Sequence, residues 1–550
     1  MTTGTDESDV TSPAPDPGRR RGGQGQLIRN TGVTSIAAGA GVVSGLLLDV
    51  SIAAGFGAGR STDAFFVAAR LPIGFASVLM AGANQALVPA ISTWLVTKGE
   101  RETARLVSLL LTATLVFGGL LAALVGVIAW PLMRITAPGL SASSVNLAAS
   151  LARIMFLVVP LVAGAEVLRA YLNARHAFAA PAAMNVVMNG LAALIVLVAA
   201  HHNMANVAWA YAIGAAAQLA FMLVMSYRKG LRYKASLKFK DPDITATGRL
   251  CGRPLLAAGL NPLARVVEQL FVSFLPRGSI TILNYAYRLI SAIGGTVFFR
   301  SVMVVLLPRM TKASTRDDQP AVARLTNSGI LIMLGLSVPL TAFMAVLAKP
   351  GALIVFHRGK FSRADAALLG IVLAIYSLNL VGAALQRALL APFYGRLDMK
   401  TPLRNSVYGV IANMVLLPLC VLPFSRGDSK AMYGVAVAFS VAQYVNVAHA
   451  WYRLKHIVPR PMAGTALTTL RLTAASAVAA ANMLIGARLV HLDDPHVTRI
   501  GLLWRTSSVG MIGVAVLALS FAAFGGSESD QILDAVFHRN GPSPRAAPVR

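Results

Sequence analysis

Cysteine and charge are both scarce in this chain of 550 residues, and each scarcity excludes a class of protein. Cys251 and Cys420 are the only cysteines, so a disulfide framework or a cysteine-rich metal site is excluded. Charged residues make up 13% and hydrophobic residues 56% of the chain. Soluble domains average about 25% charged and about 45–50% apolar residues. This composition therefore argues against a soluble multi-domain enzyme and against a disordered chain.

Sequence motifs of enzymatic chemistry are absent as well. The chain has no P-loop, no H-E-x-x-H zinc motif and no G-x-S-x-G nucleophile motif. We therefore expect a transporter and not an enzyme, without a cofactor or a metal site. Energy for transport would come from an ion gradient, with Na⁺ or H⁺ as the candidate ions, from the membrane potential, or from consumption of the product.

Positive charge is in excess, with 49 Lys+Arg against 22 Asp+Glu and a net charge of +27. In a soluble protein this excess would indicate nucleic acid. Here it accompanies long apolar runs, and basic residues collect at the cytoplasmic ends of membrane helices. We expect contact with membrane lipids and no nucleic-acid partner.

Apolar segments dominate the rest of the chain. A membrane helix needs roughly 20 apolar residues, and about fourteen segments of that length recur. They are rich in Gly, Ala and Ser, which allow close helix packing in lipid. The sequence thus predicts an all-α polytopic membrane protein with segments near 31–56, 64–94, 106–132, 147–170, 179–201, 204–227, 254–276, 279–307, 326–348, 365–391, 402–424, 431–452, 464–490 and 500–524.

The distribution of polar segments predicts the domain organisation. The basic loop around 228–253 sets the orientation, with that loop and both termini in the cytosol. The protein would be a multi-pass protein of the cytoplasmic membrane. The expected parts are a disordered tail 1–28, an N-lobe of six helices 29–228, a basic cytosolic loop 229–253, a C-lobe of six helices 254–456, two further helices 457–525 and a cytosolic tail 526–550.

Three short patterns recur at offsets of 218 to 221 residues and indicate an internal repeat. About six segments separate the copies, so the halves would share one orientation, as in a parallel repeat. The alternative is that loops after membrane helices often carry Arg followed by Pro. The matches are Arg70-Leu71 with Arg288-Leu289, Leu87-Val88-Pro89 with Leu306-Leu307-Pro308, and Arg175 and Pro181 with Arg396 and Pro402.

Charged residues lie inside several apolar segments, where they are costly and usually face a partner or a cavity. Arg265 and Glu268 have the i, i+3 spacing of a self-neutralising pair, as do Glu166 and Arg169. The alternative for Glu268 is that it helps to bind a coupling cation.

Arg70, Arg288 and Arg387 have no acidic neighbour at helical spacing. Arg70 and Arg288 are also related by the repeat. Two such arginines facing one central cavity would suit an anionic ligand, because guanidinium binds phosphate bidentately. The alternative is pairing with helix ends or with distant acids.

Four stretches carry a resemblance to a known family: 56–72, 152–189, 271–308 and 393–402. They include Phe56-Gly57-Ala58-Gly59, Thr62-Asp63-Ala64-Phe65-Phe66, Leu172-Asn173-Ala174 and the repeat landmarks above. Together they resemble the MurJ (MviN) lipid II flippase family of the MOP exporter superfamily, over most of 30–460. The resemblance implies two six-helix lobes plus two helices, a lipid-linked oligosaccharide substrate, and envelope-synthesis proteins as further partners.

The chain departs from the family at cavity positions. Family arginines on helices 1 and 2 correspond to Val42, Leu48 and Ala76, so the cavity is expected to be less basic. The resemblance implies substrate-binding residues Arg288, Arg70, Asp49, Asp63 and Arg387, and ion-coupling residues Glu268 and Asp398, with Arg265 beside Glu268.

The leading hypothesis is a flippase of polyprenyl-pyrophosphate-linked sugars that works by alternating access across the cytoplasmic membrane. Its substrate would be lipid II or a related envelope glycan lipid. The alternatives are an ion-coupled drug or metabolite exporter of the same superfamily and a non-transporting membrane scaffold for cell-envelope synthesis.

Overall fold

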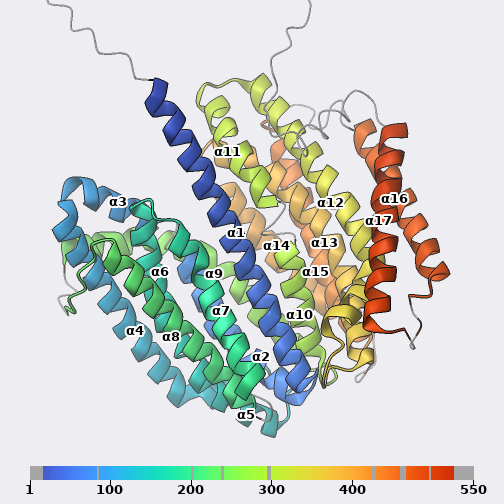
Figure 1. Ribbon diagram of the computed structural model, residues 1–550, viewed down its shortest axis with the longest axis horizontal. Coiled ribbons are helices and arrows are strands. Elements are labelled where there is room, and N and C mark those ends of the chain that lie inside the picture. Colours follow the sequence, from blue (N-terminus) through green and yellow to red (C-terminus); the bar gives the residue numbers. More distant parts are fainter. Residues whose placement is uncertain are drawn as a thin grey trace, which may run out of the picture.

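The computed structural model describes residues 17–82, 86–199, 203–236, 241–293, 299–423, 428–458, 466–492, 494 and 497–524, whose regular elements are all α-helices (Figure 1). The helices are α1 (Pro17–Phe56), α2 (Arg60–Gly82), α3 (Val88–Thr97), α4 (Gly99–Thr136), α5 (Ala142–Met155), α6 (Val158–Ala174), α7 (Ala179–Ala199), α8 (Met204–Arg228), α9 (Pro242–Val272), α10 (Ser279–Ser291), α11 (Phe299–Thr315), α12 (Gln319–Phe356), α13 (Arg363–Gly395), α14 (Lys400–Val421), α15 (Ala431–Leu454), α16 (Ala466–Leu489) and α17 (Arg499–Phe524).

The all-α polytopic class is confirmed. Twelve helical segments of the described residues are long and apolar enough to cross a membrane. Two further expected segments, 254–276 and 279–307, coincide with α9 and with the pair α10 and α11. The number of fourteen spans stays a prediction.

The expected boundary of the N-terminal tail is wrong. Residues 17–28, expected in the N-terminal tail, form the first turns of α1, while residues 1–16 and 526–550 lie outside the described residues. The described parts of the expected segments 64–94 and 279–307 are α2 with α3 and α10 with α11, and residues 83–85 and 294–298 lie outside the described residues. The expected segment 147–170 lies within one candidate span, Ala142–Ala174, which α5 and α6 form together. Pro160 lies in the first turn of α6, where the missing N–H of proline costs little.

The parallel repeat is confirmed by helix packing and by turns. In the N-lobe α1 packs on α7, α4 on α6 and α6 on α8; in the C-lobe α9 packs on α14, α12 on α13 and α13 on α15. His176 after α6 and Leu397 after α13 both have left-handed φ values, 57° and 59°. Gly57 before α2 and Gly278 before α10 do so too, at 70° and 87°. Each pair is 221 residues apart (176 to 397, 57 to 278).

Helix α9 connects the lobes and does not belong to the C-lobe alone. It packs against α2 and α4 of the N-lobe and against α14 of the C-lobe. Its start at Pro242 shortens the expected loop 229–253, and Asp241 caps it by accepting a hydrogen bond from the backbone N–H of Asp243. Arg105 on α4 pairs with Asp241 at 2.7 Å, which fixes this end of α9 to the N-lobe.

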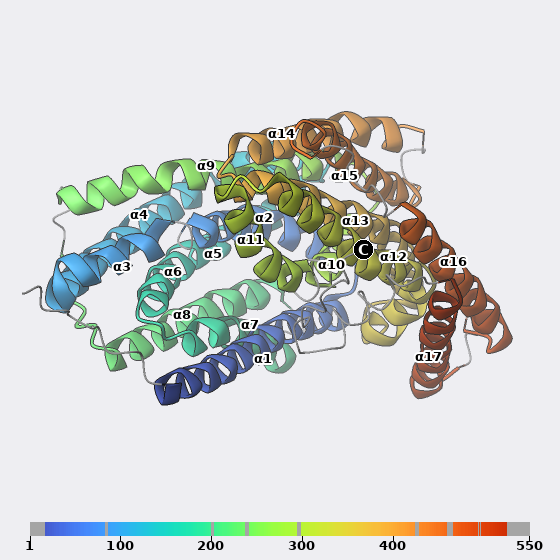
Figure 2. The same ribbon diagram turned by 90° about the horizontal axis from the view of Figure 1, so that it is seen from above.

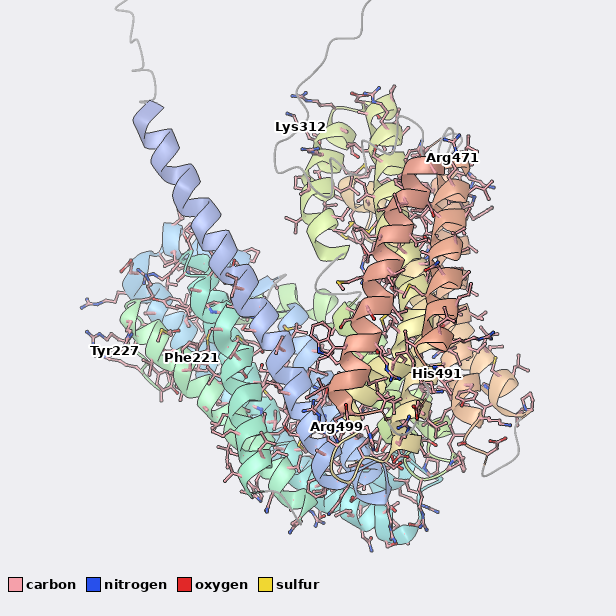
Figure 3. All side chains as sticks on the ribbon, turned by 45° about the vertical axis from the view of Figure 1, so that its right-hand side comes forward. Phe221, Tyr227, Lys312, Arg471, His491 and Arg499 are labelled. Carbon is pink, nitrogen blue, oxygen red and sulfur yellow. The ribbon has the colours of Figure 1, made fainter. Side chains whose placement is uncertain are left out.

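The last two helices lie outside the repeat. Helices α16 and α17 pack on each other and on α12, at the outer side of the C-lobe (Figure 2). Figure 3 shows Arg471 of α16 at the same end as Lys312 of α11, and Arg499 of α17 towards the other end. Helix α17 therefore finishes at the end of the molecule where α1 begins.

The lobes meet closely at the opposite end, where α1 finishes and α2 and α10 begin (Figure 1). A Cβ atom on Gly57 would lie 2.6 Å from the carbonyl oxygen of Lys360, and one on Gly359 would lie 2.2 Å from that of Ala54. The N–H of Lys360 donates to the same Ala54 oxygen at 2.8 Å. We call the contacts of Gly57, Gly139, Gly278 and Gly359 with the other lobe the glycine seam.

Candidate functional site

A central cavity of about 280 Å³ lies between the lobes and carries three arginines. Arg70 comes from α2, Arg265 from α9 and Arg288 from α10. The expectation that Arg70 and Arg288 face one cavity is therefore confirmed. The remaining wall is Phe66, Ala69, Ile73, Gly74, Ser77, Pro262, Asn284 and Tyr287.

Arg288 is anchored by an acid that sequence spacing did not reveal. Its Nη1 lies 2.5 Å from Oδ1 of Asp49 on α1, in the other lobe. The Arg288 side chain is 32% exposed, whereas that of Asp49 is 6% exposed. The carboxylate thus fixes one edge of the guanidinium, and part of its surface still faces the cavity. Both sequence interpretations, cavity lining and pairing with a distant acid, hold for Arg288.

Arg70 is held by a neutral partner. Its Nε donates to Oε1 of Gln269 on α9 at 3.0 Å. The Gln269 amide donates in turn to the carbonyl oxygen of Thr136 at 3.4 Å. A neutral amide orients the guanidinium without cancelling its charge, which suits an anion-binding group. Gln269 was missed in the sequence, although a polar amide inside an apolar segment is a signal worth following.

The two expected i, i+3 pairs are confirmed. Arg265 lies 2.6 Å from Glu268, and Arg169 pairs with Glu166. The guanidinium carbon of Arg265 also lies 3.4 Å from the ring centre of Tyr287 and 4.4 Å from that of Phe439. Arg265 is therefore neutralised and clamped by aromatic rings.

Asp63, predicted to bind substrate, lies in a hydrogen-bonded joint between the lobes. Its carboxylate accepts hydrogen bonds from the N–H of Gly278 at 2.6 Å, the N–H of Thr281 at 2.9 Å and the Thr281 hydroxyl at 2.7 Å. An acid of α2 thus caps the N-terminus of α10 across the lobes, beside the glycine seam. It does not line the central cavity.

Asp398 and Glu268 are not brought together at one cavity. Asp398 accepts hydrogen bonds from the N–H of Lys400 and from the N–H and hydroxyl of Thr401, at 2.9, 3.2 and 2.6 Å. Partial burial would raise the pKa of Asp398, but the hydrogen bonds from Thr401 and Lys400 outweigh it, and the pKa lies below its usual value. The described residues contain no group of three or more His, Cys, Asp or Glu that could hold a metal ion.

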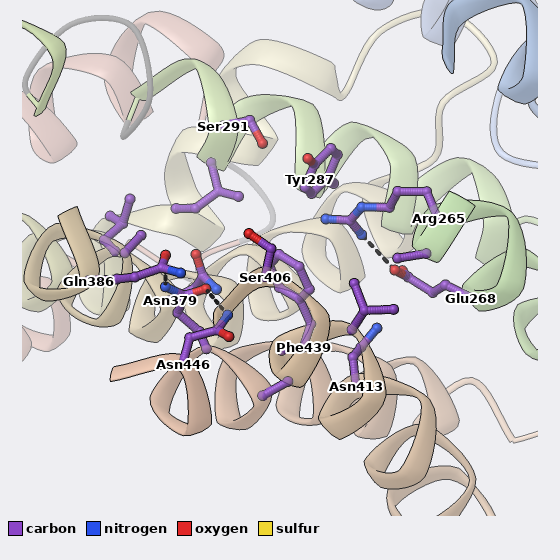
Figure 4. A pocket seen from close by; sticks show the side chains of 18 of the residues that line it. Arg265, Glu268, Tyr287, Ser291, Asn379, Gln386, Ser406, Asn413, Phe439 and Asn446 are labelled. Atoms are coloured by element: carbon purple, nitrogen blue, oxygen red, sulfur yellow. Dashed lines mark hydrogen bonds and ion pairs between the residues drawn. The ribbon is translucent and has the colours of Figure 1, made fainter. Parts of the chain in front are cut away.

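Arg387 lines a second, larger cavity inside the C-lobe, of about 420 Å³. Arg265, Glu268 and Tyr287 form the wall of this C-lobe cavity towards α9 and α10 (Figure 4). Its other wall comes from α13, α14 and α15 and is rich in amide side chains, which sequence reasoning missed: Asn379, Gln386, Asn413, Gln443 and Asn446.

Comparison with known proteins decides the family. The family model described as "Lipid II flippase MurJ" matches residues 52–493. The chain belongs to the MurJ lipid II flippase family. MurJ proteins are transporters and not enzymes, and the multi-span membrane character of this chain agrees with that membership.

Individual MurJ relatives cover most of the chain. A probable lipid II flippase MurJ of Buchnera aphidicola subsp. Acyrthosiphon pisum is 26% identical over 410 residues, which are 74% of this chain and 79% of the relative. One from Vibrio cholerae is 27% identical over 431 residues, covering 76% and 80%.

Solved structures show the same fold. A structure of lipid II flippase MurJ in an inward closed conformation covers 91% of this chain and 99% of its own, with a TM-score of 0.74 and 20% identity. An inward-facing multidrug resistance MATE transporter of the MOP superfamily covers 77% of this chain and 98% of its own, with a TM-score of 0.62 and 15% identity.

Within the MurJ fold, the departures noted in the sequence have a structural counterpart. Leu48, directly before Asp49 on α1, is fully buried in the hydrophobic core, and Val42 and Ala76 are half-buried. Helix α1 thus offers an acid, not an arginine, next to Arg288. The positive charge of the central cavity comes from α2, α9 and α10.

Proposed function

We propose that this chain is a flippase that moves lipid II, or a closely related polyprenyl-pyrophosphate-linked glycan, across the cytoplasmic membrane. The observation that carries the proposal is the meeting of Arg70 and Arg288 in one cavity between two repeated lobes. Family membership supports the same substrate class.

The charges of the central cavity fit a pyrophosphate. Glu268 neutralises Arg265, and Asp49 neutralises part of Arg288. Among the described residues, the hydrogen-bond partner of Arg70 is the neutral Gln269. Charge-assisted hydrogen bonds from guanidinium to phosphate are strong in a partly desolvated site. The cavity therefore favours an anionic group over a cation.

The two ends of the molecule support alternating access. The glycine seam and the Asp63 joint hold the lobes together at one end, and the lobes diverge towards the other end (Figure 1). With the basic segment after α8 in the cytosol, the closed end faces outward and both termini face inward. Rocking of the lobes about the cavity would then carry the head group across, with the polyprenyl chain remaining in lipid.

The test of Na⁺ or H⁺ coupling centres on Glu268, the carboxylate that lines the C-lobe cavity. A cation binding there would have to displace the guanidinium of Arg265, which lies 2.6 Å away. If Glu268 couples an ion, Glu268→Gln should abolish the dependence of transport on that ion while the protein stays folded. Unchanged ion dependence would leave Glu268 and Arg265 as a structural pair, the outcome that the geometry favours.

The decisive experiment separates the flippase from the other two functions. The purified protein is reconstituted in liposomes with labelled lipid II, and the labelled fraction exposed on each leaflet is followed with time. A flippase equilibrates the label faster than empty liposomes do. A drug exporter of the MATE kind, which the shared fold would also accommodate, would leave lipid II in place and move a cationic dye. A scaffold would move neither.

A further inference from the structure

The amide side chains of the C-lobe cavity form a connected ladder. Gln386 donates to Oδ1 of Asn405 at 2.5 Å, and Gln443 donates to Oε1 of Gln386 at 2.9 Å. Asn446 continues the ladder by donating to Gln443 at 3.4 Å, and its backbone oxygen accepts from Asn405 at 2.7 Å. Figure 4 shows Gln386, Asn379 and Asn446 side by side on the cavity wall.

Three amide side chains of the C-lobe cavity have polar atoms without a hydrogen-bond partner. Nδ2 of Asn379, Oδ1 of Asn413 and Oδ1 of Asn446 are buried and have no hydrogen-bond partner within the described structure. All three residues line the C-lobe cavity, and Asn413 is only 9% exposed. A buried polar group without a partner loses its hydrogen bonds to water and gains none in return, so such groups are rare. One donor and two acceptors around one cavity indicate a polar ligand.

Two glycines make room for this wall. A Cβ atom on Gly409 would lie 2.2 Å from Nδ2 of Asn446, and one on Gly382 would lie 2.8 Å from Cγ of Gln443. Any larger residue at either position would push the amide out of its place. The side chains of Gln443 and Asn446 therefore pack directly against the glycine backbones of α13 and α14.

The chemistry of the wall suits a ligand rich in hydroxyl and amide groups. Its carboxylate, Glu268, is neutralised by Arg265, and Arg387 adds one guanidinium. Five further side chains are amides, which both donate and accept hydrogen bonds. A volume of about 420 Å³ falls within the usual range of small-ligand pockets, about 300–1,000 Å³. Arg265 and Tyr287 line both this cavity and the central one, so the two adjoin.

We propose that the C-lobe cavity receives the sugar part of the head group while the arginines of the central cavity hold its pyrophosphate. This inference rests on the proposed flippase function and assigns its carbohydrate subsite. Hydroxyl and acetamido groups would satisfy Asn379, Asn413 and Asn446, and the ladder would hold these amides in place.

The test compares two lipids that differ only in the sugar-bearing part. Binding of lipid II and of bare undecaprenyl pyrophosphate to the purified protein in nanodiscs is measured for wild type, Asn379→Leu and Asn413→Leu. Leucine keeps the approximate volume and removes the amide. Each variant should weaken lipid II binding about fivefold to tenfold, the worth of one good hydrogen bond, and change undecaprenyl pyrophosphate binding less than twofold.

Two controls sharpen the result. Asn185→Leu removes an amide of the N-lobe that accepts from Gln218 at 3.3 Å and does not line the C-lobe cavity. It should change neither affinity. A soluble N-acetylated disaccharide should compete with lipid II on the wild type and compete less on Asn413→Leu, which separates recognition of the sugar from recognition of the lipid.

The outcomes distinguish this inference from the function on which it rests. Equal weakening of both lipids by the amide variants would make the ladder a structural network, and unchanged lipid II binding would exclude a sugar subsite. Either result overturns the carbohydrate subsite and leaves the flippase intact if undecaprenyl pyrophosphate still binds through Arg288. Failure of the wild type to bind either lipid would overturn the proposed function itself.

Discussion

Arg288 on α10 and Asp49 on α1 form an ion pair across the two lobes, with Nη1 and Oδ1 2.5 Å apart. The acid is nearly buried and the base faces the central cavity. Asp49 therefore positions the guanidinium, and it leaves other N–H groups of Arg288 for a ligand.

The Arg288–Asp49 pair should behave as a unit in a double-mutant cycle. Asp49→Asn removes the anchoring charge, so we expect lipid II flipping to fall about tenfold. In an Arg288→Ala background the same change should add almost nothing, because residues in direct contact are not additive. Flipping in liposomes and lipid binding are measured for both single variants and the double variant. Additive losses would show that Asp49 does not act through Arg288.

The glycine seam should control which end of the molecule is open. Gly359→Ala would place a Cβ atom 2.2 Å from the Ala54 carbonyl oxygen, so the lobes must separate there. Gly59→Ala is the matched control in the neighbouring turn, because nothing lies within 4 Å of its Cβ position. Spin labels attached at the exposed positions Ser143 and Arg358, on opposite lobes, report the distance between the lobes at this end of the molecule. The distance should lengthen in Gly359→Ala and stay unchanged in Gly59→Ala. If the distance is unchanged in both variants, the glycine seam does not control alternating access.

Orientation in the membrane is tested by cysteine accessibility. If the segment after α8 is cytosolic, Ser236→Cys in a cysteine-free background should stay unlabelled by an impermeant thiol reagent in intact cells. Ser143→Cys, beyond the opposite end of α4, should be labelled. The reverse pattern would invert the orientation and place the glycine seam inside.

The repeat and both i, i+3 pairs could be predicted from the amino-acid sequence, because these features depend on local patterns along the chain. Apolar length, loop charge and residue spacing are read along one chain. The partners of Arg288, Arg70 and Asp63 could not be read in this way, since Asp49, Gln269 and Thr281 lie on other helices and are brought near only by lobe packing. The amide ladder was missed for the same reason, because it joins residues of three helices.

Asp398 should stabilise the start of α14 in a pH-dependent manner. Its pKa is lowered by the hydrogen bonds from Thr401 and Lys400, so folding favours the carboxylate. That stabilisation is complete above the ordinary aspartate pKa of about 3.9 and is lost as the pH falls through the lower folded value. Asp398→Asn keeps a capping oxygen and removes the negative charge at the helix N-terminus, so it should cost about 0.3–1 kcal/mol at pH 7. In detergent, the melting temperature of Asp398→Asn should lie below that of wild type at pH 7, and this difference should narrow towards pH 3. A difference that does not depend on pH would contradict the role of the charge.

The most direct test of the account is lipid II flipping by variants of Arg288 in liposomes. Lysine keeps the charge and loses the bidentate geometry, and alanine loses both. Charge-assisted hydrogen bonds are worth about 1.5–3 kcal/mol each, so Arg288→Lys should flip more slowly and Arg288→Ala should be nearly inactive. Arg70→Ala should have an intermediate effect, and all three should insert and fold like wild type. Flipping by Arg288→Ala at the wild-type rate would contradict the claim that the cavity arginines hold the pyrophosphate.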